Sequence, residues 1–318
     1  MSGLRADLPV RPRFPTLFGV LMRRTLDLQE TVFAVVALGV AACAAVLPRW
    51  SEQSELCVIA GLIVLLGVPH GALDPVFARR QYALRSWAGW LAALALYLAL
   101  SALVVLVWRL APVVFLSGFL ILAALHFSGD LDAGVHGVSR IAYGFAVIIL
   151  PTVLHEDETR RIFLFIAGPE AASLAASALH ALSQPWLAAL LACAAFEAGA
   201  RPRSALVMAA IACMATLAPP LVSFAVFFCG MHSARHILRT LDYAEHWSAR
   251  ALIAVGVAPM AVVASAAFVL WRLYQDAPFE ARVLQIMFVG LAALTAPHMA
   301  LVERVRLAGG LGAQRASS

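Results

Sequence analysis

The chain has 318 residues, of which 63% are hydrophobic and only 13% are charged. Apolar runs long enough to cross a bilayer recur along it, so we predict an all-α protein that crosses the membrane several times. The formal net charge is +5, but the basic residues are arginines placed between the apolar runs. Orientation of the chain in a membrane explains these arginines better than binding to nucleic acid does, so we expect no nucleic-acid partner.

The predicted organisation has three parts. Residues 1–28 combine arginines with prolines before any apolar run, which predicts a cytoplasmic N-terminal tail rather than a signal peptide. Residues 29–306 are expected to form one transmembrane helical domain, and residues 307–318 a cytoplasmic C-terminal tail. About ten spans are expected, at 30–47, 56–74, 87–108, 112–129, 138–154, 185–199, 204–218, 220–239, 251–271 and 283–302.

The positions of the arginines predict the orientation. Alternate joints between the runs are rich in Arg, whereas the joint with Glu156, Asp157 and Glu158 lies on the opposite side. Because cytoplasmic joints carry an excess of positive charge, both termini should be cytoplasmic, as in a multi-pass protein of the inner cell membrane. Residues 162–183 are interrupted by Gly168 and its neighbours, and we expect an amphipathic stretch on the outer face there.

Five histidines fall within the predicted spans: His70, His126, His232, His236 and His298. Four of them lie on spans that run from outside to inside, each about 12–15 residues from the outer start, which is roughly 18–22 Å down the helix. His236 follows His232 by four residues and shares its helical face. Because ionisable rings are costly in hydrocarbon, five at one depth predict a metal ion held inside the bilayer.

A carboxylate follows three of these histidines by about one helical turn: Asp74, Asp130 and Glu303. Carboxylates commonly accept the second N–H of a metal-binding imidazole and fix its tautomer, so these three are candidates for that role. Pro69 and Pro297 each precede a histidine. They should distort the helix and turn the following ring into the bundle.

The type of ligand narrows the chemistry. An all-imidazole set suits Fe, Zn, Cu or Ni, and four neutral histidines on Fe(2+) would leave positions open for O2. Oxygen chemistry on a lipid-soluble substrate is the function that we expect. Two alternatives stay open. One is another membrane non-haem iron oxygenase or hydroxylase that acts on a polyene or lipid, and the other is a non-enzymatic membrane protein that binds metal or haem.

Four motifs occur in a characteristic order: GVPHGALD (67–74), HFSGD (126–130), HSARH (232–236) and PHMALVE (297–303). Together they resemble the Brp/Blh family of microbial β-carotene 15,15′-dioxygenases, over about residues 60–303. The chain departs from that family at Pro75, where its members often have a second histidine after the aspartate.

The resemblance implies a specific activity. It implies an Fe(2+) ion bound by His70, His126, His232 and His236, with no catalytic residue separate from the metal site. His298 matches a family position either near the iron or along the substrate path. The reaction that the resemblance implies is cleavage of the central double bond of β-carotene by O2, which gives two molecules of all-trans-retinal for a rhodopsin. The implied partners are the lipid bilayer, β-carotene and O2.

Overall fold

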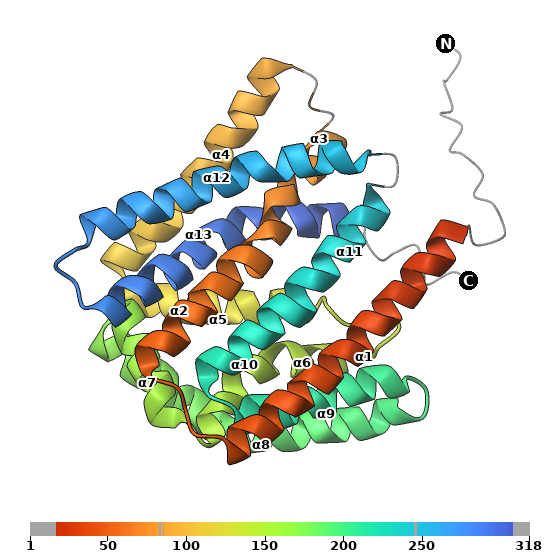
Figure 1. Cartoon of the computed structure of the whole chain (residues 1–318), viewed down its shortest axis with the longest axis vertical. Coiled ribbons are helices and arrows are strands. Elements are labelled where there is room, and N and C mark those ends of the chain that lie inside the picture. The colour runs from red at the N-terminus through yellow and green to blue at the C-terminus, as the bar shows by residue number, and fades with distance from the viewer. Residues whose placement is uncertain (1–16, 83, 85, 245–246, 308–318) are drawn as a thin grey trace, which may run out of the picture.

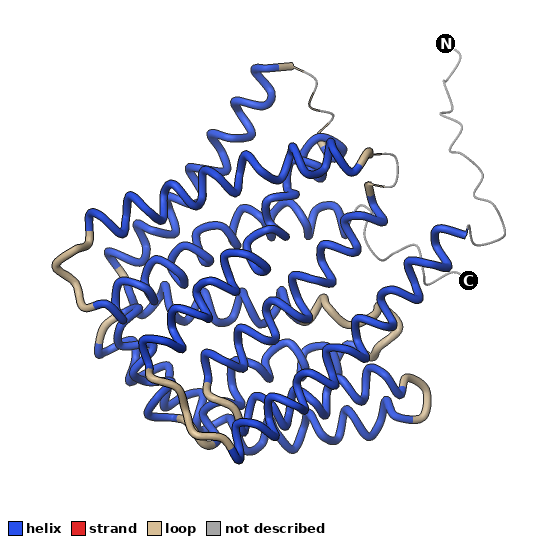
Figure 2. The backbone as a smooth tube through the Cα atoms, in the orientation of Figure 1, coloured by secondary structure: helices blue, strands red, loops and turns tan. Residues whose placement is uncertain are grey.

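The computed structural model describes residues 17–82, 84, 86–244 and 247–307. Every regular element in this part of the chain is a helix (Figure 2), which confirms the predicted all-α class. In chain order the elements are α1 (Leu17–Val46), α2 (Glu52–Leu62), η1 (Ile63–Gly67), η2 (Val68–Leu73), α3 (Asp74–Gln81), α4 (Trp87–Leu110), α5 (Pro112–Phe127), α6 (Gly137–Ile149), η3 (Leu150–Val153), α7 (Glu156–Ala167), α8 (Pro169–Ala198), α9 (Pro202–Leu217), α10 (Pro220–Phe227), η4 (Phe228–Ser233), α11 (Ala234–Tyr243), α12 (Ala249–Leu273) and α13 (Phe279–Leu307).

Most helix starts follow local sequence signals. Proline costs nothing in the first turn of a helix, where the backbone N–H has no partner within the helix. Four helices begin in this way, at Pro112, Pro169, Pro202 and Pro220. Serine hydroxyls that accept a backbone N–H stabilise other starts. Three serines do so: Ser51, Ser86 and Ser248.

The structure has fewer full-length spans than expected. Of the described helices, seven are long and apolar enough to cross a membrane, and an eighth span would arise if α6–η3 and α7, bent by 109°, counted as one. The chain is therefore a multi-pass membrane protein, but ten spans are not confirmed. The runs at 112–129 and 204–218 do form helices, yet α5 and α9 have only 16 residues each. At 1.5 Å per residue this is about 24 Å, less than the roughly 30 Å of hydrocarbon.

The segment 162–183 differs from the expectation. α7 ends before Gly168, whose φ of 84° lies in the left-handed region that favours glycine. α8 then continues without a break through Pro185. Residues 169–183 therefore do not form a separate stretch, because they belong to the same long helix as the run 185–199, and this helix packs against α7. The position of residues 162–183 on the outer face stays a prediction.

Joints that were predicted to share a side of the membrane do share an end of the bundle. Arg49, between α1 and α2, forms an ion pair with Glu158 at the start of α7, with 2.7 Å between the charged atoms. At the other end, Arg203 at the start of α9 pairs with Asp27 in α1 at 2.9 Å. The long helices run between these two ends (Figure 1).

The predicted tails are only partly described. α1 begins at Leu17, within the segment predicted as the N-terminal tail, whereas residues 1–16 and 308–318 lie outside the described part. The cytoplasmic location of both termini stays a prediction.

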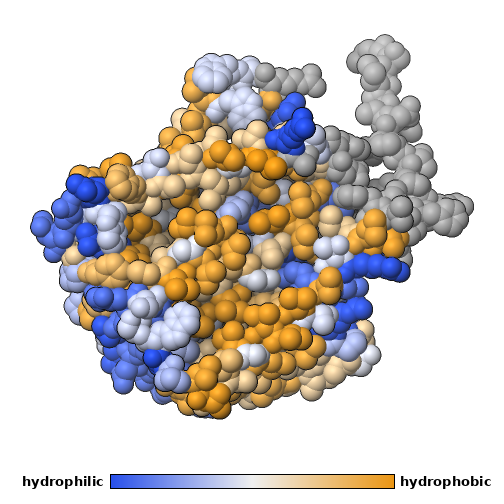
Figure 3. Space-filling model, viewed as in Figure 1, coloured by the Kyte–Doolittle hydropathy of each residue, from blue (hydrophilic) through white to orange (hydrophobic). Residues whose placement is uncertain are grey.

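The outer surface is strongly apolar. Figure 3 shows hydrophobic side chains over much of the viewed face, with hydrophilic residues gathered towards its edges. None of the residues in the apolar windows of α4 and α12 is buried inside the protein. Apolar surface this extensive is unusual in a water-soluble monomer, so contact with lipid explains it better.

The chain departs from α-helical geometry where histidines lie. Between α2 and α3 it passes through the π-helical turn η1 and the 3-10 helix η2, which contains Pro69 and His70. Between α10 and α11 it passes through a second π-helical turn, η4, which contains His232. The expected distortion at Pro69 is present, whereas α13 continues through Pro297. π-helical turns are frequent at functional sites.

A glycine allows the two distorted segments to touch. At Gly67, the last residue of η1, an added Cβ would lie 2.5 Å from Cε1 of the Phe228 ring in η4. A larger residue would require the Phe228 ring to move, so glycine at this position allows the close approach of η1 and η4.

Candidate metal centre

Five histidine side chains from five elements meet inside the bundle. They are His70 in η2, His126 in α5, His232 in η4, His236 in α11 and His298 in α13. All five are buried. For six pairs the ring centroids are 4.7–5.5 Å apart, and for His232 and His236 they are 6.5 Å apart. The structure thus brings together every histidine that the sequence predicts at one level.

These spacings can be compared with those around a metal ion. An imidazole that binds an ion at about 2.1 Å has its ring centroid roughly 3.3 Å from the ion, so ligands at right angles have centroids roughly 4.6 Å apart, and opposite ligands roughly 6.5 Å apart. The observed spacings fall within this range. No three described His, Cys, Asp or Glu side chains already form a finished metal site, so the rings would have to turn to direct their nitrogens at one ion.

The nitrogens of the rings fit this role. The Nε2 atoms of His232, His236 and His298 are buried and have no hydrogen-bond partner in the described part of the chain. The Nδ1 atom of His232 donates to Oδ1 of Asp130 at 3.0 Å, and Nδ1 of His298 donates to Oδ1 of Asp74 at 2.6 Å. With the proton on Nδ1, each Nε2 of these two rings carries the free lone pair that a metal ligand needs.

For Asp74 and Asp130, the predicted pairing with the histidine one turn earlier is wrong. Asp130 and Asp74 instead bond histidines from distant helices. Spacing of one turn aligns side chains only along a continuous α-helix, and here α5 ends before Asp130 while η2 changes the helical geometry before Asp74. Glu303 lies in α13, but its side chain is outside the described residues.

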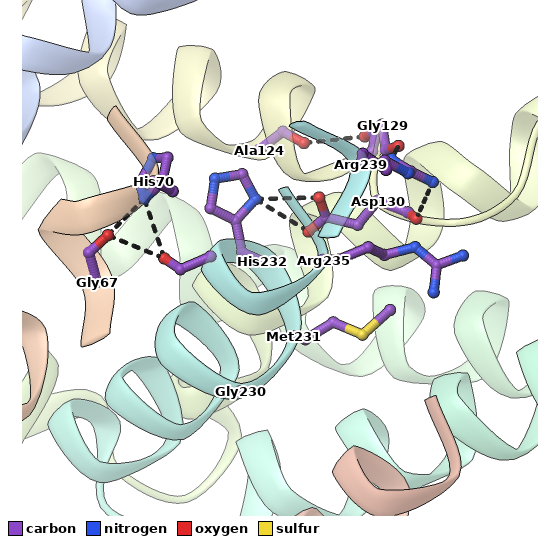
Figure 4. Close-up of polar contacts among 12 residues, drawn as sticks. Gly67, His70, Ala124, Gly129, Asp130, Gly230, Met231, His232, Arg235 and Arg239 are labelled. Atoms are coloured by element: carbon purple, nitrogen blue, oxygen red, sulfur yellow. Dashed lines mark hydrogen bonds and ion pairs between the residues drawn. The ribbon is translucent and has the colours of Figure 1, made fainter. Parts of the chain in front are cut away.

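His70 is held by a backbone carbonyl and a hydroxyl. Its Nδ1 donates to the carbonyl oxygen of Gly67 at 2.5 Å (Figure 4). The hydroxyl of Ser233 lies 3.0 Å from the same nitrogen and donates to the same carbonyl at 3.2 Å. Sequence reasoning missed Ser233, although it directly follows a predicted ligand.

The two aspartates are themselves fixed by other helices. The hydroxyl of Tyr97 in α4 lies 3.3 Å from Oδ2 of Asp74. Arg239 in α11 donates from its two terminal nitrogens to the carbonyl oxygens of Gly129 and Asp130, both at 2.8 Å (Figure 4). Nothing in the sequence indicated that Tyr97 contacts the site, since it is an isolated polar residue in an apolar span. Arg239 could be assigned only to a joint between two predicted spans.

Aromatic rings surround part of the cluster. The Phe228 ring lies 5.5 Å from the His70 ring and stacks on the His232 ring with 5.6 Å between centroids. The Phe127 ring lies 4.9 Å from the His232 ring. These contacts make the surroundings of the imidazoles apolar and limit the access of water.

A groove of about 420 Å³ opens between α5, α6 and α13. Two of its lining residues are chain neighbours of cluster histidines: Leu125 precedes His126, and Met299 follows His298. Ile141 of α6 also lines the groove, together with the polar side chains of Ser128 and Arg140. The groove therefore lies next to the backbone that carries two of the five rings.

The remaining described histidines lie elsewhere. His136 is exposed and accepts a backbone N–H at the start of α6, and His180 contacts the carbonyl oxygen of Thr152 at 2.8 Å. His155 lies at the start of α7, beside Glu158.

The fold and this cluster define a multi-pass membrane protein with a buried all-imidazole centre. Comparison with known proteins gives the family. The profile of the family described as "Beta-carotene 15,15'-dioxygenase" matches residues 61–305. The chain therefore belongs to the β-carotene 15,15′-dioxygenase family and is a carotenoid cleavage dioxygenase, which confirms the resemblance carried by the four motifs.

Two curated relatives resemble most of the chain. It is 29% identical over 264 residues to the Beta-carotene 15,15'-dioxygenase of uncultured marine bacterium 66A03, an alignment that covers 78% of this chain and 93% of the relative. It is 28% identical over 320 residues to the Probable beta-carotene 15,15'-dioxygenase Blh of Halobacterium salinarum, covering 88% and 93%. No solved structure matches the chain significantly.

Proposed function

We propose that this chain cleaves the central 15,15′ double bond of β-carotene with O2 and releases two molecules of all-trans-retinal. The proposed cofactor is one Fe(2+) ion held by His70, His126, His232 and His236, with His298 as a fifth candidate ligand. The observation that carries the metal site is the set of buried Nε2 atoms without partners on rings whose Nδ1 atoms bond carboxylates. Family membership supports the reaction.

The donor set suits the proposed cofactor. Neutral imidazoles bind iron well, whereas a site for Mg²⁺ or Ca²⁺ would need several oxygen ligands. The carboxylates of Asp74 and Asp130 accept hydrogen bonds from imidazole Nδ1 atoms. They would therefore orient the imidazole ligands and would not bind the ion themselves. Bound Fe(2+) would supply the activation of O2. The reaction balances without a reductant, because the two oxygen atoms of O2 become the carbonyl oxygens of two C20 aldehydes.

The side chains of the protein would perform the remaining tasks. Asp130 and Asp74 hold two imidazoles in one tautomer and one orientation. Phe228 and Phe127 would exclude water from the reaction site, which limits side reactions. Positioning of the central double bond, and not of its neighbours, beside the ion would determine which bond is cut.

The surroundings suit a lipid-soluble polyene. β-Carotene dissolves in the bilayer core, so a site between membrane helices receives it without passage through water. The groove beside α5 and α13 has apolar walls at Leu125, Ile141 and Met299 and would admit one arm of the polyene. We place the protein in the inner cell membrane, where the retinal would be available to a rhodopsin.

Expression in a bacterium that accumulates β-carotene tests the proposal. The cells should lose pigment and gain retinal as the single C20 product, measured by chromatography, because a centrally placed ion cuts the symmetric polyene into equal halves. Cells that express the His126→Ala variant should keep their pigment. Unequal fragments, or no carotenoid turnover by an iron-replete preparation, would favour the alternative of a lipid-oxidising enzyme.

The same cells test the groove. Ile141→Trp should lower the yield of retinal by filling the groove, whereas Ile253→Trp, on the exposed face of α12, should leave the yield unchanged. Equal yields from both variants would remove the groove from the substrate path.

A further inference from the structure

Helix α1 contacts the histidine-bearing segment η4–α11 through two consecutive polar side chains, Gln29 and Glu30. α1 precedes the part of the chain that the family profile matches, which begins at residue 61. Glu30 is nevertheless only 3% exposed. A carboxylate buried in a membrane helix is costly and marks a specific role.

Gln29 contacts the backbone of the π-helical turn. Its Nε2 donates to the carbonyl oxygen of Gly230 at 2.8 Å and lies 3.4 Å from that of Met231. A π-helical turn changes the hydrogen-bond register, so its carbonyl groups need partners outside the regular α-helical pattern. The amide of Gln29 supplies such a partner directly before His232.

Glu30 pairs with the guanidinium of Arg235, which lies between His232 and His236 in sequence. Arg235 is 1% exposed, and its NH1 atom lies 2.8 Å from Oε1 of Glu30. The same NH1 donates to Oε1 of Gln29 at 3.3 Å. Removal of a guanidinium from water costs more free energy than one hydrogen bond to a neutral group recovers. A buried arginine therefore needs a negatively charged partner.

Arg235 also connects α1 to the turn that supports His232. Its NH2 atom donates to Oδ1 of Asp132 at 2.7 Å. Asp132 lies two residues after Asp130, whose carboxylate accepts the Nδ1 proton of His232. In Figure 4 the side chain of Asp130 lies beside those of His232 and Arg235, although Asp130 comes from a distant segment of the chain.

We propose that α1 is part of the metal centre as a positioning element. Gln29 holds the π-helical turn, and Glu30 holds Arg235, so that His232 in η4 and His236 in α11 face the same ion. This inference rests on the proposed metal site. Gln29, Glu30 and Arg235 are positioning residues, since they act through the two histidines and do not contact the ion.

Full-length protein with substitutions in α1 tests the proposal. Glu30→Gln and Gln29→Ala should each weaken Fe(2+) binding about 10–100-fold, the size expected when the support of a ligand is removed. They should also change the visible absorption spectrum of the Co(2+)-substituted protein, which reports the ligand geometry. Glu30→Asp should restore part of the affinity, and Thr31→Ala, on the exposed side of the same helix, should change neither measurement.

A double variant guards against misfolding. Glu30→Gln with Arg235→Gln removes both buried charges together, so it should fold even where Glu30→Gln alone does not. It should still show weakened Fe(2+) binding and a changed Co(2+) spectrum. Lower thermal stability with unaltered affinity and spectrum would overturn the role of α1 and leave the metal site intact. A wild-type protein that binds neither metal would overturn the proposed function itself, and this inference with it.

Discussion

Alanine in place of His232 should remove most of the iron from the purified protein and abolish carotene cleavage. The His232 ring lies 4.7 Å from that of His126 and 5.1 Å from that of His70, and its buried Nε2 has no partner in the described part of the chain. Loss of one imidazole opens the ligand set to water, which holds the ion more weakly. Iron per chain, measured by elemental analysis, and retinal formation are the two readouts.

The same result is expected for the other members of the cluster. His70→Ala, His126→Ala and His236→Ala should each lose most of the iron. His298→Ala decides between four and five ligands, and we expect it to lose iron too, because its Nε2 is as isolated and its Nδ1 as firmly bonded as those of His232. The control is His180→Ala, far from the cluster. Full iron content in two or more of the cluster variants would contradict the metal site.

Asparagine in place of Asp74 or Asp130 should lower the activity and the iron affinity by about 10–100-fold while the fold persists. Asparagine keeps the shape of the side chain but removes the negative charge that fixes the Nδ1 proton of the partner imidazole. Asp130 acts through His232, and Asp74 acts through His298. The aspartate substitution should therefore cause no further loss of activity or iron affinity when the partner histidine is already alanine.

Steady-state kinetics and chelator competition measure these effects. The matched control is Asp276→Asn, an exposed aspartate in the joint between α12 and α13. An Asp74→Asn or Asp130→Asn variant with wild-type kinetics would show that these hydrogen bonds do not support the metal. Strict additivity with the histidine variants would show that the aspartates act elsewhere.

The helical fold and the gathering of the five histidines could be predicted from the sequence. Apolar runs identify membrane helices because hydrocarbon tolerates few polar groups, and the same cost makes a histidine within such a run conspicuous. Counting residues from the ends of the runs was enough to place His70 and His298 at one level, since all α-helices rise equally per residue. His298, which the resemblance left either near the iron or along the substrate path, also lies within the cluster.

The partners of the rings could not be predicted in this way. Spacing of one turn suggested that Asp74 supports His70, but the 3-10 helix η2 intervenes, and Asp74 bonds His298 from α13 instead. The π-helical turns depend on contacts between distant segments, such as Gly67 against Phe228. Arg235 shows the same limit, since its partners Glu30 and Asp132 come from two other segments.

Reconstitution of the metal-free protein tests the central claim most directly. Protein stripped of metal by a chelator, then given increasing Fe(2+) without oxygen, should form no retinal until O2 and β-carotene are added. The rate of retinal formation should then rise with iron and level off at about one iron per chain, as expected for a single site within the histidine cluster. Retinal formation by the metal-free protein, or a rate that levels off at two irons per chain, would contradict the account.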